Sequence, residues 1–76
     1  QAQHELRTAQ YYYERHAYVA AIERAQRVVR EFQNTPMRDD ALELIRTCYE
    51  SLKMDDLAQD TQRLIDINKG REKTVR

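Results

Sequence analysis

The sequence predicts an all-α fold of two stacked helical hairpins, and three patterns carry that prediction. Apolar residues recur at three- and four-residue spacing through four segments, as they do on one face of a helix. The single proline and the single glycine of the 76-residue chain, Pro36 and Gly70, stand where a helix is expected to begin and to end. Sliding the sequence by 36 positions superposes Leu6 on Leu42 along with other apolar residues, which indicates a repeated unit.

The first hairpin is centred on the run from Tyr11 to Ala25. Its first helix is expected over about Ala2–Arg15, with Leu6, Ala9, Tyr12, Tyr13 and His16 facing inward. After a break at His16 and Ala17, the second helix is expected over about Tyr18–Gln33, with an inward face of Tyr18, Ala21, Ile22, Ala25, Val28, Val29 and Phe32. Because small alanines face large tyrosines, two antiparallel helices can approach closely and interlock.

The second hairpin begins at Pro36, a good first helical residue because it needs no N–H partner, and the Thr35 side chain is expected to cap that helix. The third helix should run to about Leu52 and bury Ala41, Leu42, Ile45, Cys48, Tyr49 and Leu52. Asp55 is the expected N-cap of a fourth helix over about Asp56–Asn68, whose inward face is Leu57, Thr61, Leu64 and Ile65. Gly70 suits the position just past its end.

These elements predict one repeat segment over residues 1–70, with repeat one at about 2–33 and repeat two at about 36–69, followed by a polar tail at 71–76. Leu44 and Ile67 fall at the edge of the inward stripes, where they could cover a neighbouring repeat, touch a partner or lie exposed. About three repeats are usually needed for a stable array. We therefore expect another polypeptide to pack against the first helix.

The composition argues against several classes of function. Thirteen basic and thirteen acidic side chains leave no net field to attract nucleic acid, and no apolar run is long enough to span a membrane. Cys48 is expected to be a core residue rather than a nucleophile. His4 and His16 have no carboxylate partners in the pattern, so no metal is expected. We expect no catalytic residues and no cofactor, and in the tyrosine run only Tyr11 is left for solvent or a partner.

Four residues fit the pattern of the tetratricopeptide repeat, a 34-residue helical hairpin: Ala9, Tyr12, Ala21 and Ala25. Two features depart from it, since Gln33 stands at the closing proline and the usual glycine before the second helix is absent. The predicted architecture is therefore two stacked tetratricopeptide-like hairpins, four antiparallel helices in all, forming a fragment of an α-solenoid.

The ordered sequence from Tyr12 to Ala20 resembles the fourth repeat of the BamD family, the periplasmic lipoproteins of the outer-membrane β-barrel assembly machine. The resemblance continues through Asp40-Ala41-Leu42 and Cys48-Tyr49 into that family's fifth and last repeat, and covers roughly Leu6 to Asn68. His16 stands where the family commonly has a glycine. Cys48 is not the family's lipid-bearing cysteine, which sits at the mature N-terminus and is missing here.

The resemblance implies a non-catalytic scaffold segment at the periplasmic face of the outer membrane. Its partners would be the membrane-proximal POTRA domain of BamA and other assembly-machine lipoproteins, with no nucleic acid, and with membrane attachment only through an N-terminal lipid anchor absent from this segment. The family's charged contact matches Arg24, whose planar fork suits bidentate pairing with a carboxylate. The neighbouring candidates are Tyr18, Glu14, Glu23, Arg27 and Arg30. Two alternatives stay open: Arg24 as a solvated surface charge, and a generic tetratricopeptide adaptor that binds a peptide or another complex subunit.

Overall fold

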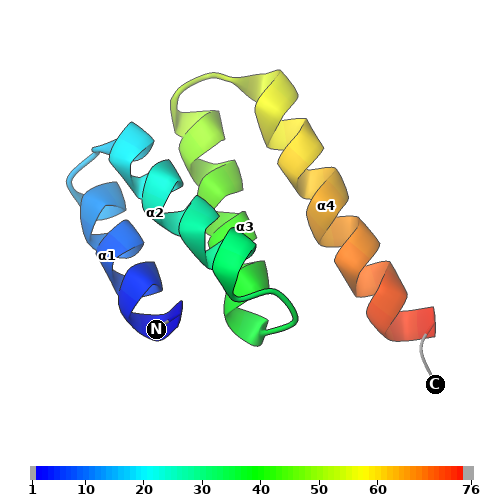
Figure 1. The fold of residues 1–76 in the computed structure, drawn as a ribbon. Helices are drawn as coiled ribbons and strands as arrows, with labels where there is room; N and C mark the ends of the chain where they lie inside the picture. The colour runs from blue at the N-terminus through cyan, green and yellow to red at the C-terminus, as the bar shows by residue number, and fades with distance from the viewer. Residues whose placement is uncertain (1, 75–76) are drawn as a thin grey trace.

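Within residues 2–74, four helices follow one another in alternating directions (Figure 1). The structure, a computed structural model, describes the backbone of residues 2–74 and the side chains of residues 3–70. The helices are α1 (Ala2–Glu14), α2 (Tyr18–Glu31), α3 (Pro36–Ser51) and α4 (Asp55–Thr74). No strand occurs within residues 2–74. The all-α, tetratricopeptide-like pair of hairpins is confirmed.

The core lies between α1, α2 and the face of α3 that packs on them. It is built largely from small residues, and the buried side chains are Leu6, Ala9, Ala21, Ile22, Ala25, Val28, Ala41, Ile45 and Cys48. The aromatic and larger apolar residues Tyr12, Tyr13, Tyr18, Val29, Phe32, Leu44, Tyr49 and Leu52 pack around this cluster. The inward faces predicted for the first three helices are confirmed apart from His16, which is exposed.

His16 is exposed because it occupies the turn between α1 and α2 in a left-handed conformation, with φ at 64°. Its N–H donates to the carbonyl of Tyr13 over 2.9 Å, and the Ala17 N–H donates to that of Tyr12 over 2.9 Å. This pair of bonds is the Schellman arrangement, in which glycine is the usual left-handed residue. The glycine expected from the repeat pattern is thus replaced by a strained histidine.

The second hairpin repeats this turn at Lys53, with φ at 61°. The Lys53 N–H donates to Glu50 over 3.0 Å and the Met54 N–H donates to Tyr49 over 2.9 Å. His16 and Lys53 are 37 positions apart, as are the last residues of α1 and α3 and the first residues of α2 and α4. The backbone repeat is therefore 37 residues, one more than the apolar pattern suggested.

The start of α3 differs from the prediction in one bond. Thr35 is the N-cap and Pro36 the first helical residue, as expected, but the Thr35 side chain caps no N–H group of the helix. Its Oγ1 instead donates to the carbonyl of Phe32 over 2.7 Å. That carbonyl belongs to the C-cap of α2, so the hydroxyl ties off the end of one helix rather than the beginning of the next.

The prediction was less accurate for α4. The helix begins at Asp55, one residue earlier than expected, and continues through Gly70 to Thr74 instead of ending near Asn68. Gly70 does not have a positive φ and so does not form a left-handed cap. Thr61 and Ile65 are buried as predicted, but Leu57 and Leu64 are 39% and 46% exposed, and the buried Ala58 was not predicted. The division into a 1–70 segment and a 71–76 tail remains a prediction.

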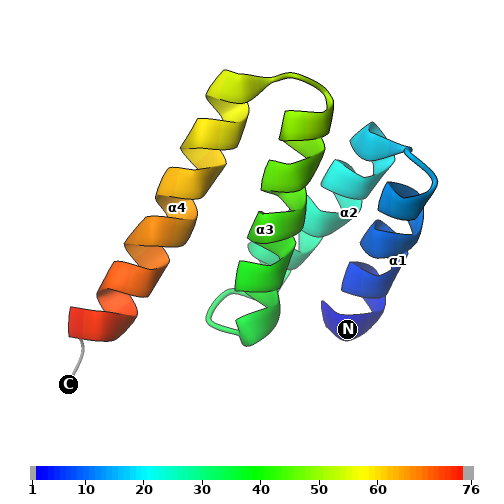
Figure 2. The ribbon, with the colours of Figure 1, turned by 180° about the vertical axis from the view of Figure 1, so that it is seen from behind.

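The exposed leucines follow from how α4 is placed. Figure 2 shows α3 between α4 and the α1–α2 hairpin, and no Cα atom of α2 lies within 8 Å of one in α4 among the described residues. The molecule measures 41 × 29 × 16 Å. Since α3 is the only helix that contacts α4 within residues 2–74, α4 can bury no more than a narrow stripe.

The surface of the second hairpin around Arg46 is polar. Arg46 of α3 donates to Glu43 over 2.9 Å and to Glu50 over 3.0 Å. The hydrogen bond to Glu43 is the main reason that the pKa of Arg46 is raised. Around it lie polar groups of α4: Asp55, Gln59 and Gln62.

Candidate protein-docking surface

The outer surface of the first hairpin carries a charged cluster between α1 and α2. Glu5 of α1 faces two arginines of α2, with Arg24 Nη1 at 3.8 Å from Glu5 Oε1 and Arg27 Nη1 at 3.4 Å from Glu5 Oε2. The Arg24 guanidinium also lies over the Tyr12 ring, 5.9 Å from its centroid. We call these four residues, Glu5, Tyr12, Arg24 and Arg27, the Glu5 cluster.

The Glu5 cluster combines two positive charges with one negative charge. The Glu5 side chain is 18% exposed, against 40% for Arg24 and 44% for Arg27, so the arginines lie outermost. Glu5 Oε1 accepts no hydrogen bond from the described residues, and its contact with Arg24 is only an ion pair. Because arginine has five N–H donors, Arg24 keeps enough of them to bind a second carboxylate. The cluster therefore suits an acidic partner.

Tyr18 lies next to the turn between the two helices. Its ring stacks on that of His16 at 5.8 Å between centroids and tilts against Tyr13, also at 5.8 Å. Glu14 is exposed at the end of α1 beside this turn. These aromatic contacts fix the position of the first residue of α2, the helix that carries Arg24. Tyr18 thus acts here as a packed support as well as a half-buried surface residue.

The remaining two candidates do not join the Glu5 cluster. Glu23 is exposed and has no described ion pair. Arg30 lies on the other flank of α2 and borders the space between α2 and α4. Thus, of the six residues proposed from the sequence, the structure brings Arg24 and Arg27 together, places Tyr18 and Glu14 at the neighbouring turn, and separates Arg30.

Glu5 was missed by the sequence reasoning, although the sequence contains a clue to it. In an antiparallel hairpin, residues equally distant from the turn face each other, and Glu5 and Arg27 each lie eleven residues from His16. An acidic residue at that register is the natural partner for the arginines of α2. The inward apolar pattern drew attention to Leu6 and away from its charged neighbour.

Other chemistry finds little support in the described part of the chain. Cys48 is fully buried, and burial raises the pKa of its thiol from 9.0 to about 11, which disfavours the reactive thiolate. Within the described residues, no group of three or more histidine, cysteine or carboxylate side chains is placed to hold a metal ion. Across the same residues, none of the helices combines the length and apolarity needed to cross a membrane.

Comparison with known proteins adds an independent observation. Residues 1–64 match the family model YfiO, described as an outer membrane lipoprotein. The chain is 38% identical over 64 residues to the outer membrane protein assembly factor BamD of Neisseria meningitidis, a match that covers 84% of this chain and 24% of that protein. It is 37% identical over 70 residues to BamD of Pasteurella multocida, covering 92% and 27%. The chain thus spans about a quarter of the length of these relatives.

Proposed function

The chain belongs to the YfiO family of outer membrane lipoproteins, and from this premise we propose that it is a non-catalytic scaffold segment of the outer-membrane β-barrel assembly machine. Its relatives are named as outer membrane protein assembly factors. The segment would work at the periplasmic face of the bacterial outer membrane. Its task would be to dock the membrane-proximal POTRA domain of BamA through the Glu5 cluster.

The observation that carries this proposal is the surplus positive charge of the Glu5 cluster on a packed helix. Arg24 and Arg27 share one carboxylate, and both side chains are more than one-third exposed. An acidic group on the partner would complete the pairing without dismantling the internal contact to Glu5. Planar guanidinium groups favour such bidentate carboxylate contacts, and stacking on Tyr12 restrains Arg24 before binding.

In this proposal the segment is a rigid support for the docked domain. The helix that carries Arg24 contributes Ala21, Ile22, Ala25 and Val28 to the core, so its outward residues cannot rotate independently of the fold. Residues ordered before binding lose little conformational freedom when the partner arrives. A docked POTRA domain would therefore be held in one orientation, which is what an assembly scaffold must provide.

Calorimetric titration with the isolated POTRA domain tests the proposal. Arg24→Glu places a negative charge beside Glu5 and opposite the partner's acid, so Kd should rise by at least about tenfold. Arg63→Glu is the matched control, because Arg63 is also an exposed, ion-paired arginine but lies on α4. Arg24→Lys keeps the charge and loses the fork, and should give an intermediate Kd.

The alternative is a generic tetratricopeptide adaptor that binds a peptide or another complex subunit. It predicts no POTRA binding at any ionic strength, or binding that Arg24→Glu and Arg63→Glu weaken equally. The proposal predicts instead that binding weakens as salt is added, since partly exposed charge pairs are screened. Salt-independent binding would count against the Glu5 cluster as the contact.

A further inference from the structure

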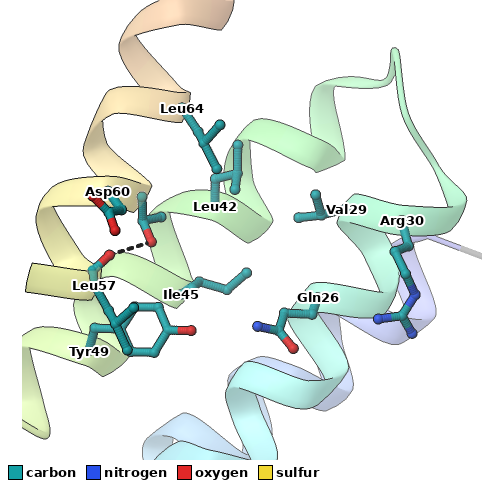
Figure 3. Close-up of a pocket in the computed structure, with 10 residues that line it drawn as sticks. Gln26, Val29, Arg30, Leu42, Ile45, Tyr49, Leu57, Asp60 and Leu64 are labelled. Carbon is teal, nitrogen blue, oxygen red and sulfur yellow. Dashed lines mark hydrogen bonds between the residues drawn. The ribbon is translucent and has the colours of Figure 1, made fainter. Parts of the chain in front are cut away.

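A groove runs between α2 and α4 with α3 as its floor (Figure 3). Its volume is about 430 Å³. The floor is apolar and consists of Leu42, Ile45 and Tyr49, while the α4 wall is lined by Leu57, Asp60, Thr61 and Leu64. Figure 3 shows Leu64 pointing toward Leu42, and Gln26 and Val29 facing the groove from α2. We call this feature the α2–α4 groove.

The α2–α4 groove is apolar surface that the fold leaves uncovered. Leu57 and Leu64 are 39% and 46% exposed although both belong to the inward half of α4. They are seven residues apart, which places them two turns apart on one side of the helix. Such a ridge is what one helix offers to another in ridges-into-grooves packing, and helices so packed lie about 8–10 Å apart. The geometry is that of a position for one more helix.

The two walls of the α2–α4 groove differ in charge. Arg30 borders it on the α2 side and has no ion pair among the described residues. Asp60 borders it on the α4 side. Asp60 does pair with Arg63, but both side chains are largely exposed and the pair is weak. An occupant with an acidic flank toward α2 and a basic flank toward α4 would complement both walls.

Polar groups inside the groove add a smaller constraint. The Gln26 amide and the Tyr49 hydroxyl both reach into the space, and neither makes a hydrogen bond to another described side chain or to the backbone. A polar side chain of an occupant could satisfy them. Apolar walls with a few convergent polar groups are typical of a binding site rather than of an incidental surface hollow.

We propose that the α2–α4 groove binds an amphipathic helix of a partner protein, with an apolar stripe against α3 and oppositely charged flanks facing Arg30 and Asp60. This surface is separate from the Glu5 cluster, and the inference does not depend on the proposed POTRA contact. A second copy of the chain is the competing occupant, since it would bring the exposed Leu57 and Leu64 of its own α4.

A designed peptide tests this inference directly. The probe is a helical peptide of about 15 residues, roughly four turns, with a leucine stripe, glutamates along one flank and lysines along the other. Two comparison peptides carry glutamates on both flanks or lysines on both flanks. Binding is measured by fluorescence anisotropy with the 76-residue chain. Only the mixed peptide has a flank of opposite charge for each wall, and it can do so because a helix can enter the groove in either direction. We therefore expect it to bind about threefold more tightly than either uniform peptide.

Two variants locate the binding site. Leu64→Glu should weaken binding at least about tenfold because it puts a charge on the apolar wall. Ile67→Glu is the matched control, since Ile67 is 51% exposed on the same helix but does not border the groove. Arg30→Glu makes both walls acidic and should transfer the preference to the lysine-flanked peptide.

Three outcomes would overturn the inference. The first is no binding of the mixed peptide at concentrations up to about 1 mM. The second is binding that Leu64→Glu and Ile67→Glu weaken equally, or whose flank preference ignores Arg30→Glu. The third is a dimer in light scattering that Leu64→Glu dissociates, which would assign the α2–α4 groove to a second copy of the chain.

Discussion

The two hairpins have the same turn conformation, but residues at equivalent positions form an apolar surface in the first hairpin and a polar surface in the second. At the 37-residue spacing set by the turns, the buried Leu6, Ala9, Ile22 and Ala25 of the first hairpin correspond to Glu43, Arg46, Gln59 and Gln62 of the second. The first set forms the core on which α3 packs. The second set is polar, with Arg46 paired to its neighbours and Gln59 exposed.

This difference shows that a hairpin can repeat the backbone conformation of the preceding one without repeating the apolar face on which another helix packs. The turns have the same geometry in both hairpins, although α3 and α4 (16 and 20 residues) are longer than α1 and α2 (13 and 14 residues). At equivalent positions, only the first hairpin offers an apolar face that a following helix covers. A polar outer face is typical of the repeat that caps an array. What the second hairpin leaves uncovered is instead its other side, the α2–α4 groove. Directed substitutions at matched positions can break or sharpen this contrast.

The largest effect is expected from exchanging matched residues of the two faces. Ile22→Gln puts an amide into a site that is 7% exposed, and should lower the free energy of unfolding by about 2–4 kcal/mol through lost burial and an unsatisfied polar group. Gln59→Ile is the reciprocal change on the polar face and should alter stability by no more than about 0.5 kcal/mol. Urea denaturation measures both; equal effects would remove the distinction between the faces.

A second contrast concerns the first helix of each hairpin, α1 and α3. Cys48 of α3 is fully buried, whereas Tyr11, its counterpart in α1 at the 37-residue spacing, is 50% exposed. Burial raises the pKa of the folded Cys48 thiol from 9.0 to about 11. Above about pH 9 the unfolded thiol therefore loses its proton while the folded thiol keeps it. Because the folded state then binds more protons than the unfolded state, the free energy of unfolding falls as pH rises.

The loss attributable to Cys48 should approach about 2 kcal/mol by about pH 10.5. Urea denaturation of the chain and of Cys48→Ala at about pH 8 and at that higher pH gives the change in the free energy of unfolding between the two pH values for each protein. The difference between these two changes is the contribution of Cys48, since the contributions of the tyrosines and lysines common to both proteins cancel. Parallel pH dependences for the two proteins would show that the buried thiol makes no such contribution.

A third prediction uses the feature that the hairpins share. His16 and Lys53 occupy equivalent left-handed turns, a conformation that costs a residue with a Cβ about 1–2 kcal/mol. Lys53→Gly should therefore stabilise the protein by about 1 kcal/mol. His16→Gly should gain less because it also removes the ring stacked on Tyr18. Thermal melts of both variants check this order, and destabilisation by Lys53→Gly would contradict the 37-residue register.

The smallest effect is expected at Gly70, within the part of α4 that extends beyond the length of α2. An added Cβ there meets nothing within 4 Å. Gly70→Ala should raise stability by about 0.5–1 kcal/mol, the difference in helix propensity between the two residues. Circular dichroism in a urea series measures it; a loss of helix or stability would place Gly70 at a helix end after all.

How far the sequence could predict this molecule depended on where each residue finds its neighbours. The faces of α1, α2 and α3 followed from apolar spacing because each of these helices packs on at least two others. In α4 the same spacing was misleading: Leu57 and Leu64 look like core residues, but α2 does not reach them. The pattern shows which residues could be buried, and only the packing of whole helices decides which are.

The candidate docking surface shows the same limit for charged residues. Arg24 was singled out by resemblance and Arg27 was named as a neighbouring candidate, and the structure places the two together. Glu5 was overlooked because its role depends on a contact between helices rather than on a local motif. Arg30 was grouped with them by proximity along the chain, yet it lies on the other flank of α2, where it borders the α2–α4 groove.

The most direct measurement for the central claim is a titration of the isotope-labelled chain with the POTRA domain, followed by amide chemical shifts. The account predicts perturbations that centre on Glu5, Tyr18, Arg24 and Arg27, on the outer surface of the first hairpin. Amides around Arg46, Gln59 and Gln62, on the polar face of the second hairpin, should not move. Shifts confined to that second face, or no shifts at saturating POTRA domain, would contradict the docking role assigned to the Glu5 cluster.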